Sequence, residues 1–380
     1  MKSELGFSRL LLVVLFLGLA TTAVASTTWY VDGVNGSDSN NCMSATTACQ
    51  TIGHAISLAS SGDSIMVAPA TYTENLTISI NLKILGANAS TTIVDGGGKG
   101  TVVTISRAGV TLSELTIRNG SAYYGGGIRN AGKLVINDST ISGNSATDFG
   151  GGIYTVDGTQ TTLNNTTISG NTAKEGGGIA NKGTLTINRS TISANESHSC
   201  SRKLCIGFGG GVINFGQGTL TLNNSTLSGN TSVSGGGIFN YGTVTINNST
   251  ISGNSAAVGA IVGGSVILQN SIVANSSGGP NCFGTMTSNG YNLSSDNSCN
   301  FNGPGDLNNT DPMLGSLASN GGPTQTMALL PGSPAIDAGN PNGCTDGKGN
   351  LLKTDQRGFP RPDKEDTSGC DMGAFERQTD

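Results

Sequence analysis

The chain has 380 residues, of which 59 are glycine, 5% are aromatic and 11% are charged. A net charge of −5 excludes the basic surface typical of proteins that bind nucleic acid or anionic membranes. Low charge combined with many Thr, Ile and Val residues favours strands over disorder. We therefore expect a folded, all-β protein with no nucleic-acid partner.

The first 25 residues carry the pattern of a secretory signal peptide. Lys2 and Arg9 provide a basic start, residues 10–19 are a short apolar run, and residues 23–25 form a small-residue cleavage site. The run is too short to span a bilayer comfortably, and no later segment is long and apolar enough to do so. The sequence predicts a protein that is secreted or held on a cell surface, without a transmembrane segment in the mature chain.

Residues 26–75 are predicted to form an N-terminal cap together with the first strands. Within them, residues 51–60 have the apolar spacing of an amphipathic helix. A short helix of this kind covers the strand edges and the apolar stack that the open end of a solenoid exposes. We expect His54 on the surface of this cap, with no catalytic role.

A repeat dominates residues 76–280. Short β-branched runs lead into five copies of a GGGI-type motif, and each copy closes with an Asn. The copies start 25, 26, 33 and 26 residues apart, a period typical of solenoids in which each repeat is one coil. The five starts are Gly125, Gly150, Gly176, Gly209 and Gly235.

Three apolar clusters recur in each copy, which predicts three short strands per coil. Coils stacked about 4.8 Å apart pair each strand with its equivalents above and below, and this is a parallel β-helix. One buried ladder should contain Ile128, Ile153, Ile179, Val212 and Ile238. Another should contain Ile141, Ile168, Ile192, Leu227 and Ile251. The closing asparagines suit left-handed bends and can hydrogen-bond along a ladder. They are Asn144, Asn171, Asn195, Asn230 and Asn254.

Residues 196–208 interrupt the repeat with an insertion, which in a solenoid projects as a loop. The insertion contains two of the eight cysteines, an even number in a chain expected to meet oxidising conditions. Because each close pair brackets a loop, we expect neighbours to form disulfides. The pairs are Cys42 with Cys49, Cys200 with Cys205, Cys282 with Cys299, and Cys344 with Cys370. A zinc site is the weaker alternative, since there is no CxxC motif and only two histidines.

Composition changes near residue 280. Nine of the ten prolines lie at or after Pro280, so residues 281–380 are expected to form a loop-rich module that could cap the other end of the coil. Four acidic residues of this module could bind Ca²⁺ or pair with Arg357 and Arg361. They are Asp337, Asp355, Asp371 and Glu376. We expect ion pairs, with no resident metal or cofactor.

Two sets of motifs carry resemblances to known families. The GGGI copies and the N-terminal segment resemble secreted right-handed parallel β-helix proteins of the pectate-lyase-like superfamily. The copies are also similar to the GGA[I/L]-type repeats of polymorphic outer membrane proteins, although the FxxN element is absent. The tail resembles the choice-of-anchor Q domain through DPMLGSLASNGGPTQTMALLPGSPAIDAGNP, TDQRGFPRP and DMGAFE. These resemblances imply an extracellular bacterial β-helix protein. No anchor motif follows DMGAFE, so any tether is expected to be non-covalent.

Catalysis on polysaccharides requires clustered charges. A lyase needs carboxylates for Ca²⁺ and a basic residue, and a glycoside hydrolase needs two carboxylates that flank the bond. Between residues 204 and 305 the only charged residue is Asp296. Other acidic residues, such as Asp148 and Glu175, are spread over several repeats. We therefore assign no catalytic residues, and keep a polysaccharide lyase or glycoside hydrolase as the alternative.

Two outward columns after the GGG turns hold four aromatic residues of a chain that has few. One column is Arg129, Tyr154, Ala180, Ile213 and Phe239, and the other is Ala131, Val156, Lys182, Phe215 and Tyr241. Aromatic faces on a rigid sheet can stack on sugar rings. The predicted ligand-binding residues are Arg129, Tyr154, Lys182, Phe215, Phe239 and Tyr241. The alternative is that these rings pack under a neighbouring loop or under the C-terminal module.

A third interpretation is an ice-binding face made by a column of outward threonines. These are Thr140, Thr167, Thr191, Thr226 and Thr250. Taken together, the sequence predicts one right-handed parallel β-helix with a short N-terminal capping helix and a loop-rich C-terminal module. The expected protein is a monomeric, exported, non-catalytic surface or matrix protein, an adhesin or glycan binder whose partner is an extracellular polysaccharide or a cell-surface glycan.

Overall fold

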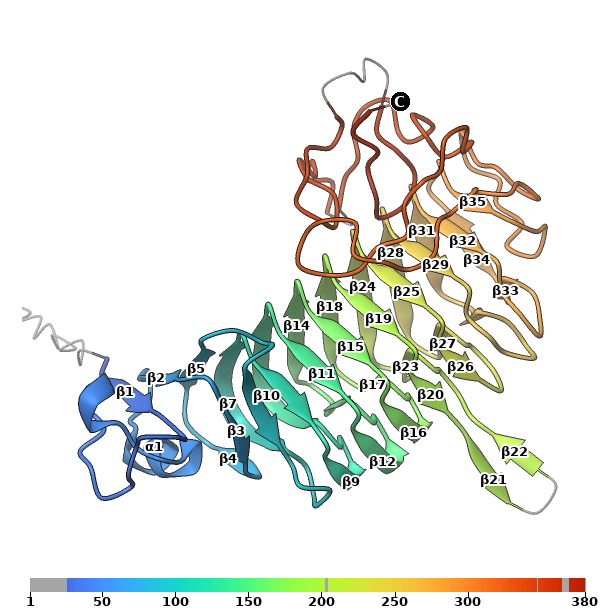
Figure 1. The fold of residues 1–380 in the computed structure, drawn as a ribbon. Helices are drawn as coiled ribbons and strands as arrows, with labels where there is room; N and C mark the ends of the chain where they lie inside the picture. Colours follow the sequence, from blue (N-terminus) through green and yellow to red (C-terminus); the bar gives the residue numbers. More distant parts are fainter. Residues whose placement is uncertain (1–25, 202–203, 347, 364–368, 380) are drawn as a thin grey trace, which may run out of the picture.

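The computed structural model describes residues 26–379 except 202–203, 347 and 364–368. The predicted signal peptide lies outside the described residues. The chain forms a right-handed parallel β-helix, as predicted, in which successive coils stack along one axis (Figure 1). Each well-formed coil contributes strands to three parallel sheets, called A, B and C here.

Sheet A has 18 strands, because most coils contribute two short strands to it. These are β1 (Thr28–Val31), β2 (Ser64–Val67), β4 (Leu76–Ile78), β5 (Leu82–Gly86), β7 (Val103–Ser113), β10 (Ile128–Asn137), β13 (Ile153–Thr155), β14 (Gln160–Asn164), β17 (Ile179–Asn181), β18 (Thr184–Asn188), β23 (Val212–Asn214), β24 (Thr219–Asn223), β27 (Ile238–Asn240), β28 (Thr243–Asn247), β30 (Ile261–Gly263), β31 (Val266–Gln269), β33 (Cys282–Phe283) and β34 (Met286–Ser288).

Sheets B and C complete the coil with 10 and 5 strands. Sheet B contains β3 (Ala70–Thr73), β6 (Thr92–Asp95), β8 (Thr116–Arg118), β11 (Thr140–Ser142), β15 (Thr167–Ser169), β19 (Thr191–Ser193), β25 (Thr226–Ser228), β29 (Thr250–Ser252), β32 (Ile272–Ala274) and β35 (Leu293–Ser294). Sheet C contains β9 (Ser121–Tyr124), β12 (Ser145–Phe149), β16 (Thr172–Glu175), β20 (Glu196–Ser197) and β26 (Thr231–Ser232). The insertion forms a separate antiparallel hairpin of β21 (Ser199–Ser201) and β22 (Leu204–Ile206).

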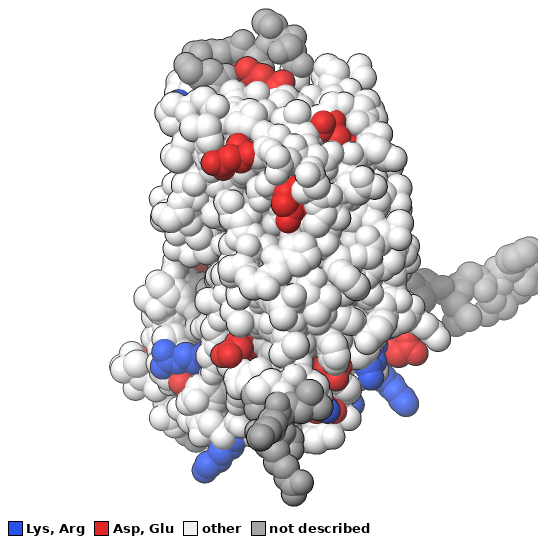
Figure 2. All heavy atoms as spheres, turned by 90° about the vertical axis from the view of Figure 1, so that its right-hand side faces the viewer, with Lys and Arg blue, Asp and Glu red and all other residues white. Residues whose placement is uncertain are grey.

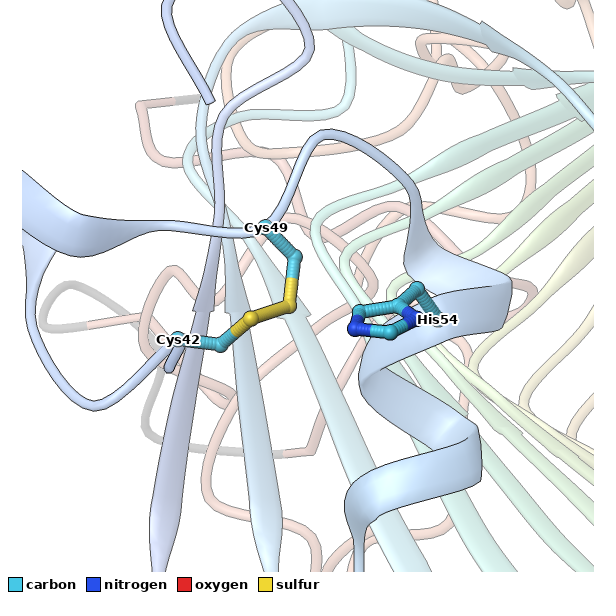
Figure 3. Close-up of side chains that lie close together, drawn as sticks. All are labelled: Cys42, Cys49 and His54. Atoms are coloured by element: carbon cyan, nitrogen blue, oxygen red, sulfur yellow. A yellow bond between two sulfur atoms is a disulfide. The ribbon is translucent and has the colours of Figure 1, made fainter. Parts of the chain in front are cut away.

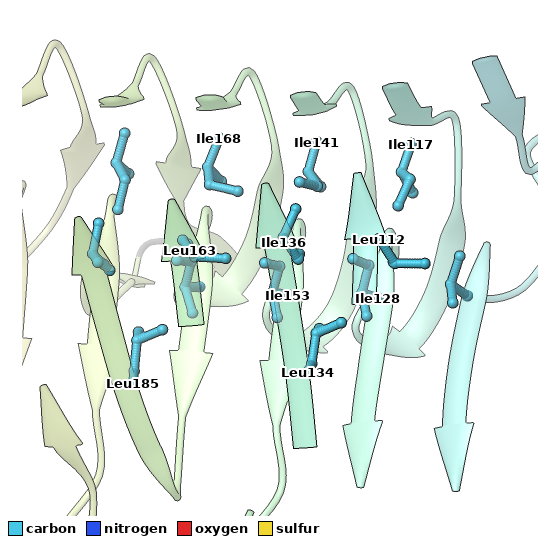
Figure 4. Packing of buried hydrophobic residues seen from close by; sticks show 14 of the residues in the cluster. Leu112, Ile117, Ile128, Leu134, Ile136, Ile141, Ile153, Leu163, Ile168 and Leu185 are labelled. Carbon is cyan, nitrogen blue, oxygen red and sulfur yellow. The ribbon is translucent and has the colours of Figure 1, made fainter. Parts of the chain in front are cut away.

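The core consists of apolar ladders that run from coil to coil (Figure 4). Both predicted isoleucine ladders are confirmed by the strand register. Ile153, for example, pairs with Ile128 and Ile179, and Ile168 pairs with Ile141 and Ile192. All of these side chains are fully buried. Because each buried aliphatic side chain stabilises a fold by about 1.5–3 kcal/mol, the ladders provide the main driving force for stacking.

The predicted asparagine ladder lies inside the corner between sheets B and C. The side-chain amide of each Asn except Asn254 donates to the side-chain oxygen of the Asn in the next coil, at 2.9 Å from Asn171 to Asn195 and from Asn195 to Asn230. Left-handed backbone occurs at the residue before each Asn, such as Gly170 (φ 62°) and Ala194 (φ 52°). The closing asparagines therefore satisfy buried polar groups, while their neighbours make the bend.

The N-terminal cap contains α1 (Ile52–Leu58) and a short 3-10 turn, η1 (Ala45–Thr47). The Thr51 side chain caps α1 by accepting from the backbone N–H of His54. Two more N–H groups at the helix start donate to the carboxylate of Glu74, at 2.8 and 2.9 Å. A carboxylate at this end of a helix satisfies free N–H groups and complements the helix dipole. The predicted capping helix is confirmed.

Three of the four predicted disulfides are present between described residues: Cys42–Cys49, Cys282–Cys299 and Cys344–Cys370. Cys205 is also disulfide-bonded, and it lies opposite Cys200 in the β21–β22 hairpin. Disulfides across such short segments stabilise loops that carry few core contacts.

Strand pairing continues past residue 280, because β33, β34 and β35 remain in register with the preceding coil. Phe301 and the cysteines of the Cys282–Cys299 bridge belong to the main core. The end of the coil is thus closed by the segment that directly follows β35.

The C-terminal module lies against the side of the coil and covers part of sheet B (Figure 1). Gln356, which is fully buried, accepts from the Thr226 hydroxyl at 2.6 Å and donates to the Thr191 hydroxyl at 2.9 Å. The Thr250 hydroxyl accepts from the backbone N–H of Ala374. The module therefore occupies three of the five threonines of the predicted ice-binding column. That interpretation was wrong, because the column is a docking surface.

Buried ion pairs hold the module together. Arg361 donates to Glu376 at 2.7 Å, and both side chains are completely buried. Arg357 donates to Asp355 at 2.8 Å and lies over the ring of Phe375. The expected ion pairing of these carboxylates is confirmed for Asp355 and Glu376, which agrees with the rule that buried charges are paired.

We predict that Gln356→Ala weakens docking by about 2–3 kcal/mol, because it leaves buried hydroxyl and carbonyl groups on both surfaces without partners. Urea unfolding of the full chain measures this change. Gln325→Ala is the matched control, since that side chain is exposed and its loss should change stability by less than about 0.5 kcal/mol. Equal effects of the two substitutions would contradict the docking role.

The contribution of Glu376 and Asp371 to the stability of the module should fall as pH rises. Burial raises the pKa of Glu376 from 4.5 to about 7 and the pKa of Asp371 from 3.8 to about 6. At these two groups the folded state holds protons that the unfolded state releases, so their contribution to stability is greatest below about pH 4 and is lost as pH rises through 6 to 7. We expect Glu376→Gln to destabilise the protein at acidic pH but to flatten this slope. Thermal unfolding between pH 4 and 8 tests this, with Asp311→Asn as the exposed control. An unchanged slope in Glu376→Gln would contradict it.

Candidate functional site

The GGG motifs form the corner at which sheet C meets sheet A. The first glycine has left-handed backbone, with φ 68° at Gly150. The second contacts the adjacent coil so closely that a Cβ on Gly126 would lie 2.2 Å from the carbonyl oxygen of Ser145. Only glycine allows both features. The turn brings outward side chains of the two sheets together, and they pack into a second cluster outside the main core.

We call this cluster, with the rings and charges that border it, the aromatic corner. It follows the coil axis over several coils and combines residues that end the sheet C strands with residues of sheet A. Its aromatic members are Tyr123, Tyr124, Phe149, Tyr154, Phe208, Phe215, Phe239 and Tyr241. Tyr124 stacks on Phe149 and Tyr154, with ring centroids 5.5 and 5.2 Å apart. Contacts of this kind add about 0.5–1.5 kcal/mol per pair beyond burial.

The structure brings five of the six predicted ligand-binding residues into this corner. Tyr154, Lys182 and Phe215 gather around Phe149, whereas Phe239 and Tyr241 contact each other with ring centroids 4.8 Å apart. Arg129, the sixth, is half-buried and pairs in register with Tyr154.

The exposure of the predicted residues differs sharply. Tyr154 and Phe239 are only 8% exposed, because neighbouring rings cover them. Tyr241 is 59% exposed and Tyr123 is 61% exposed. The buried rings therefore build the corner, and the exposed rings at its surface are available for contact with a ligand.

Lys182 lies among three rings. Its ammonium group is 4.8 Å from the centroid of Phe149, 4.9 Å from that of Phe215 and 5.7 Å from that of Tyr154. Cation–π attraction of this kind contributes about 0.5–2 kcal/mol and fixes the position of the charge. Among the salt bridges of the described residues, none involves Lys182. The ammonium group is thus held by rings and keeps its capacity to pair with an anion.

Charged residues border the aromatic corner on adjacent coils. Lys174 lies 3.6 Å from Asp148. Glu175 is half-buried, and burial raises the pKa of its carboxyl group, a change that Lys174 and Lys182 oppose and Asp148 reinforces. The pKa of the Tyr123 phenol is raised, chiefly by the charge of Asp148. Asp148 and Glu175 are 27 residues apart in the sequence but lie on adjacent coils.

Sequence reasoning missed the sheet C half of the corner. Its members occupy the position immediately before each GGG: Tyr124, Phe149, Glu175, Phe208 and Ser234. Strand register confirms that these residues align from coil to coil. Aligning the GGG motifs would have shown the column of residues that precede them. The sequence does not show, however, that this column packs against the column after the turn, because that depends on the turn angle.

Other sites in the described residues are less suited to a ligand. A hollow of about 500 Å³ lies between sheet B and Pro323 of the C-terminal module, and its carboxylates Glu114 and Asp138 are exposed. The face in Figure 2 carries few charged side chains across its middle.

A single described group, Cys42, Cys49 and His54, has metal-ligand atoms in mutual reach, but its sulfur atoms form a disulfide (Figure 3). Within the described chain, no helix combines the length and apolar character needed to span a bilayer.

Comparison with known proteins identifies the fold. No family model matches the chain, and no curated protein matches its sequence. The pectate lyase Pel9A matches with a TM-score of 0.55 and 16% identity over 93% of this chain and 98% of that structure. A pectin methylesterase from Aspergillus niger matches with a TM-score of 0.39 and 17% identity over 73% of this chain and 89% of that structure. A pectin methylesterase from carrot matches with a TM-score of 0.40 and 13% identity over 68% of this chain and 85% of that structure. The first likeness establishes a pectate-lyase-like parallel β-helix fold.

We predict that Phe239→Ala and Tyr241→Ala have different effects on stability. Phe239 packs against Phe208 and is nearly buried, so its loss should cost about 3 kcal/mol of unfolding free energy. Tyr241 is exposed, and its loss should cost about 1 kcal/mol or less. Chemical denaturation of both variants measures this. Similar costs would show that Tyr241 is also a packing residue and unsuitable for binding tests.

Proposed function

We propose that this protein is an exported surface or matrix protein that binds a polysaccharide at the aromatic corner. The observation that carries the proposal is a rigid aromatic surface that ends in the exposed rings of Tyr123 and Tyr241. Pyranose rings are apolar on one face and stack on aromatic rings, while their hydroxyl groups stay in water. Buried contacts fix the rings before a ligand arrives, so that little conformational entropy is lost on binding.

Several features support an acidic polymer as the ligand. Lys182 is held at the corner without a salt-bridge partner among the described residues, and Arg129 pairs in register with Tyr154, one of the rings around Lys182. An ammonium and a guanidinium group can each pair with a uronate carboxylate. The structural neighbour Pel9A is a pectate lyase, which makes polygalacturonate the first polymer to test. The disulfides fit an oxidising, extracellular location.

Affinity electrophoresis of the full chain in gels containing polygalacturonate, or a neutral glucan as comparison, tests binding. We expect retardation by the acidic polymer. Tyr241→Ala combined with Lys182→Gln should weaken binding about tenfold or more, since a stacking contact and an ion pair together contribute at least 1.4 kcal/mol.

Met66→Ala provides the matched control, because Met66 is a 41% exposed apolar residue on the same sheet but lies near the N-terminal end of the coil. This variant should bind like the unmodified protein. Absence of retardation by every polymer tested, or equal retardation of the double variant, would contradict the proposed function.

A further inference from the structure

The C-terminal module binds the outer face of sheet B through two columns of side chains. In the threonine column, the Thr226 hydroxyl donates to the side chain of Gln356 at 2.6 Å. The second column is the residue with left-handed backbone between each sheet A strand and the following sheet B strand. Its member Asn224 accepts from Arg361 at 2.8 Å and donates to the carbonyl oxygen of Thr354 at 2.8 Å. An arginine, an amide side chain and a backbone carbonyl group therefore recognise this face.

Both columns continue beyond the edge of the module. In the threonine column, Thr140 pairs in register with Thr116 and Thr167. In the left-handed column, Asp138 and Glu114 stand where the coils of β25 and β29 have asparagines. Figure 1 shows the module against the C-terminal part of the coil, with β11 beyond it. The face that binds the module is therefore only partly occupied by it.

The unoccupied part of this face is a hollow of about 500 Å³. Residues 88–90 bound one end, where the Ala89 carbonyl oxygen accepts from the Thr116 hydroxyl at 2.6 Å. Pro323 of the module bounds the other end. The carboxylates in the hollow are exposed, so it does not enclose a small molecule as a pocket does. A polypeptide segment lying in it would extend the interface that the module has already formed with the coil.

The hollow presents acceptors that this chain leaves partly unused. Glu114 and Asp138 hold equivalent positions on adjacent coils, since their backbone N–H groups each donate to the same position of the next coil. One oxygen of Asp138 accepts from Asn165 at 2.9 Å. Within the described part of the chain, the Glu114 carboxylate accepts no hydrogen bond and neither carboxylate forms a salt bridge. A partner must therefore supply donors, and arginine donates to a carboxylate through two parallel hydrogen bonds.

We propose that this hollow is the docking site of an extended segment of a partner protein in which an arginine lies close to an amide side chain. The arginine pairs with Asp138, which takes the position of Asn224. The amide side chain bonds to the hydroxyl of Thr140, which takes the position of Thr226. An arginine here also offsets the repulsion between the like charges of Glu114 and Asp138 on adjacent coils. The site lies on sheet B, away from the aromatic corner, so the inference does not rest on polysaccharide binding.

The probe for the test is the nonapeptide KTDQRGFPR, which copies residues 353–361 and so contains the Gln356 and Arg361 of the docked interface. The docked coils are already occupied by the module, so the uncovered coils are left for the added peptide. Fluorescence anisotropy with the full chain measures binding. We expect saturable binding that weakens with added salt, and binding at least about tenfold weaker when Arg357→Gln and Arg361→Gln are made in the peptide.

Asp138→Asn in the full chain should weaken peptide binding about tenfold, because it removes the charge from the hydrogen bond. Asparagine tolerates left-handed backbone, so this variant keeps the bend. Glu114→Gln tests the second carboxylate and should weaken binding as well. Asp157→Asn is the matched control, since it removes an exposed carboxylate in the turn between β13 and β14 and should bind like the unmodified protein. All three variants should keep the unfolding midpoint of the unmodified protein.

Absence of saturable binding overturns the inference, as does equal binding of the two peptides or equal binding by Asp138→Asn and Asp157→Asn. Retardation of the full chain by a polysaccharide that Asp138→Asn abolishes would make the hollow a carbohydrate site, and this too overturns the inference. Affinity electrophoresis in polygalacturonate should give the same retardation for Asp138→Asn as for the unmodified protein. Failure of peptide docking with this retardation unchanged leaves the proposed function intact.

Discussion

Parallel hydrogen bonding between successive coils determines where every side chain of this protein lies. Each strand pairs with the same segment of the coil before and after it, so residues with equivalent positions form columns along the axis. A column of one chemical type reinforces itself, as the buried isoleucine and asparagine ladders do. Where one residue of a column differs in chemical type, its side chain still lies among the side chains of the neighbouring coils, because strand pairing fixes its position.

The GGG corner shows how this constraint produces a candidate site from structural residues. Its glycines allow the backbones of adjacent coils to approach closely, and the turn packs outward rings of two sheets against each other. Most of these rings are buried and contribute stability. Glu175 and Lys182 interrupt the aromatic column, and the rigid rings around them define their positions. In the proposed binding site, the buried rings therefore provide structure and the exposed members are available for a ligand.

The C-terminal module uses the same regularity for docking. Threonines of three successive coils present hydroxyl groups at equal spacing, and Gln356 and the backbone of Ala374 bond to them. The module itself has few strands, so buried ion pairs such as Arg361 with Glu376 replace a sheet as its internal framework. Docking covers the middle of sheet B and leaves the aromatic corner on another side of the coil uncovered.

The sequence by itself determined the coil. Its period, the two isoleucine ladders, the capping helix that starts after Thr51 and three disulfides follow from local or periodic patterns. Half of the candidate site was also predictable, because the sheet A column repeats after each GGG. Only the tertiary structure decided which columns are covered. Thr140 and Thr250 both stand in the sequence STISGN, yet of the two only Thr250 is bonded to the module, through a residue 124 positions away.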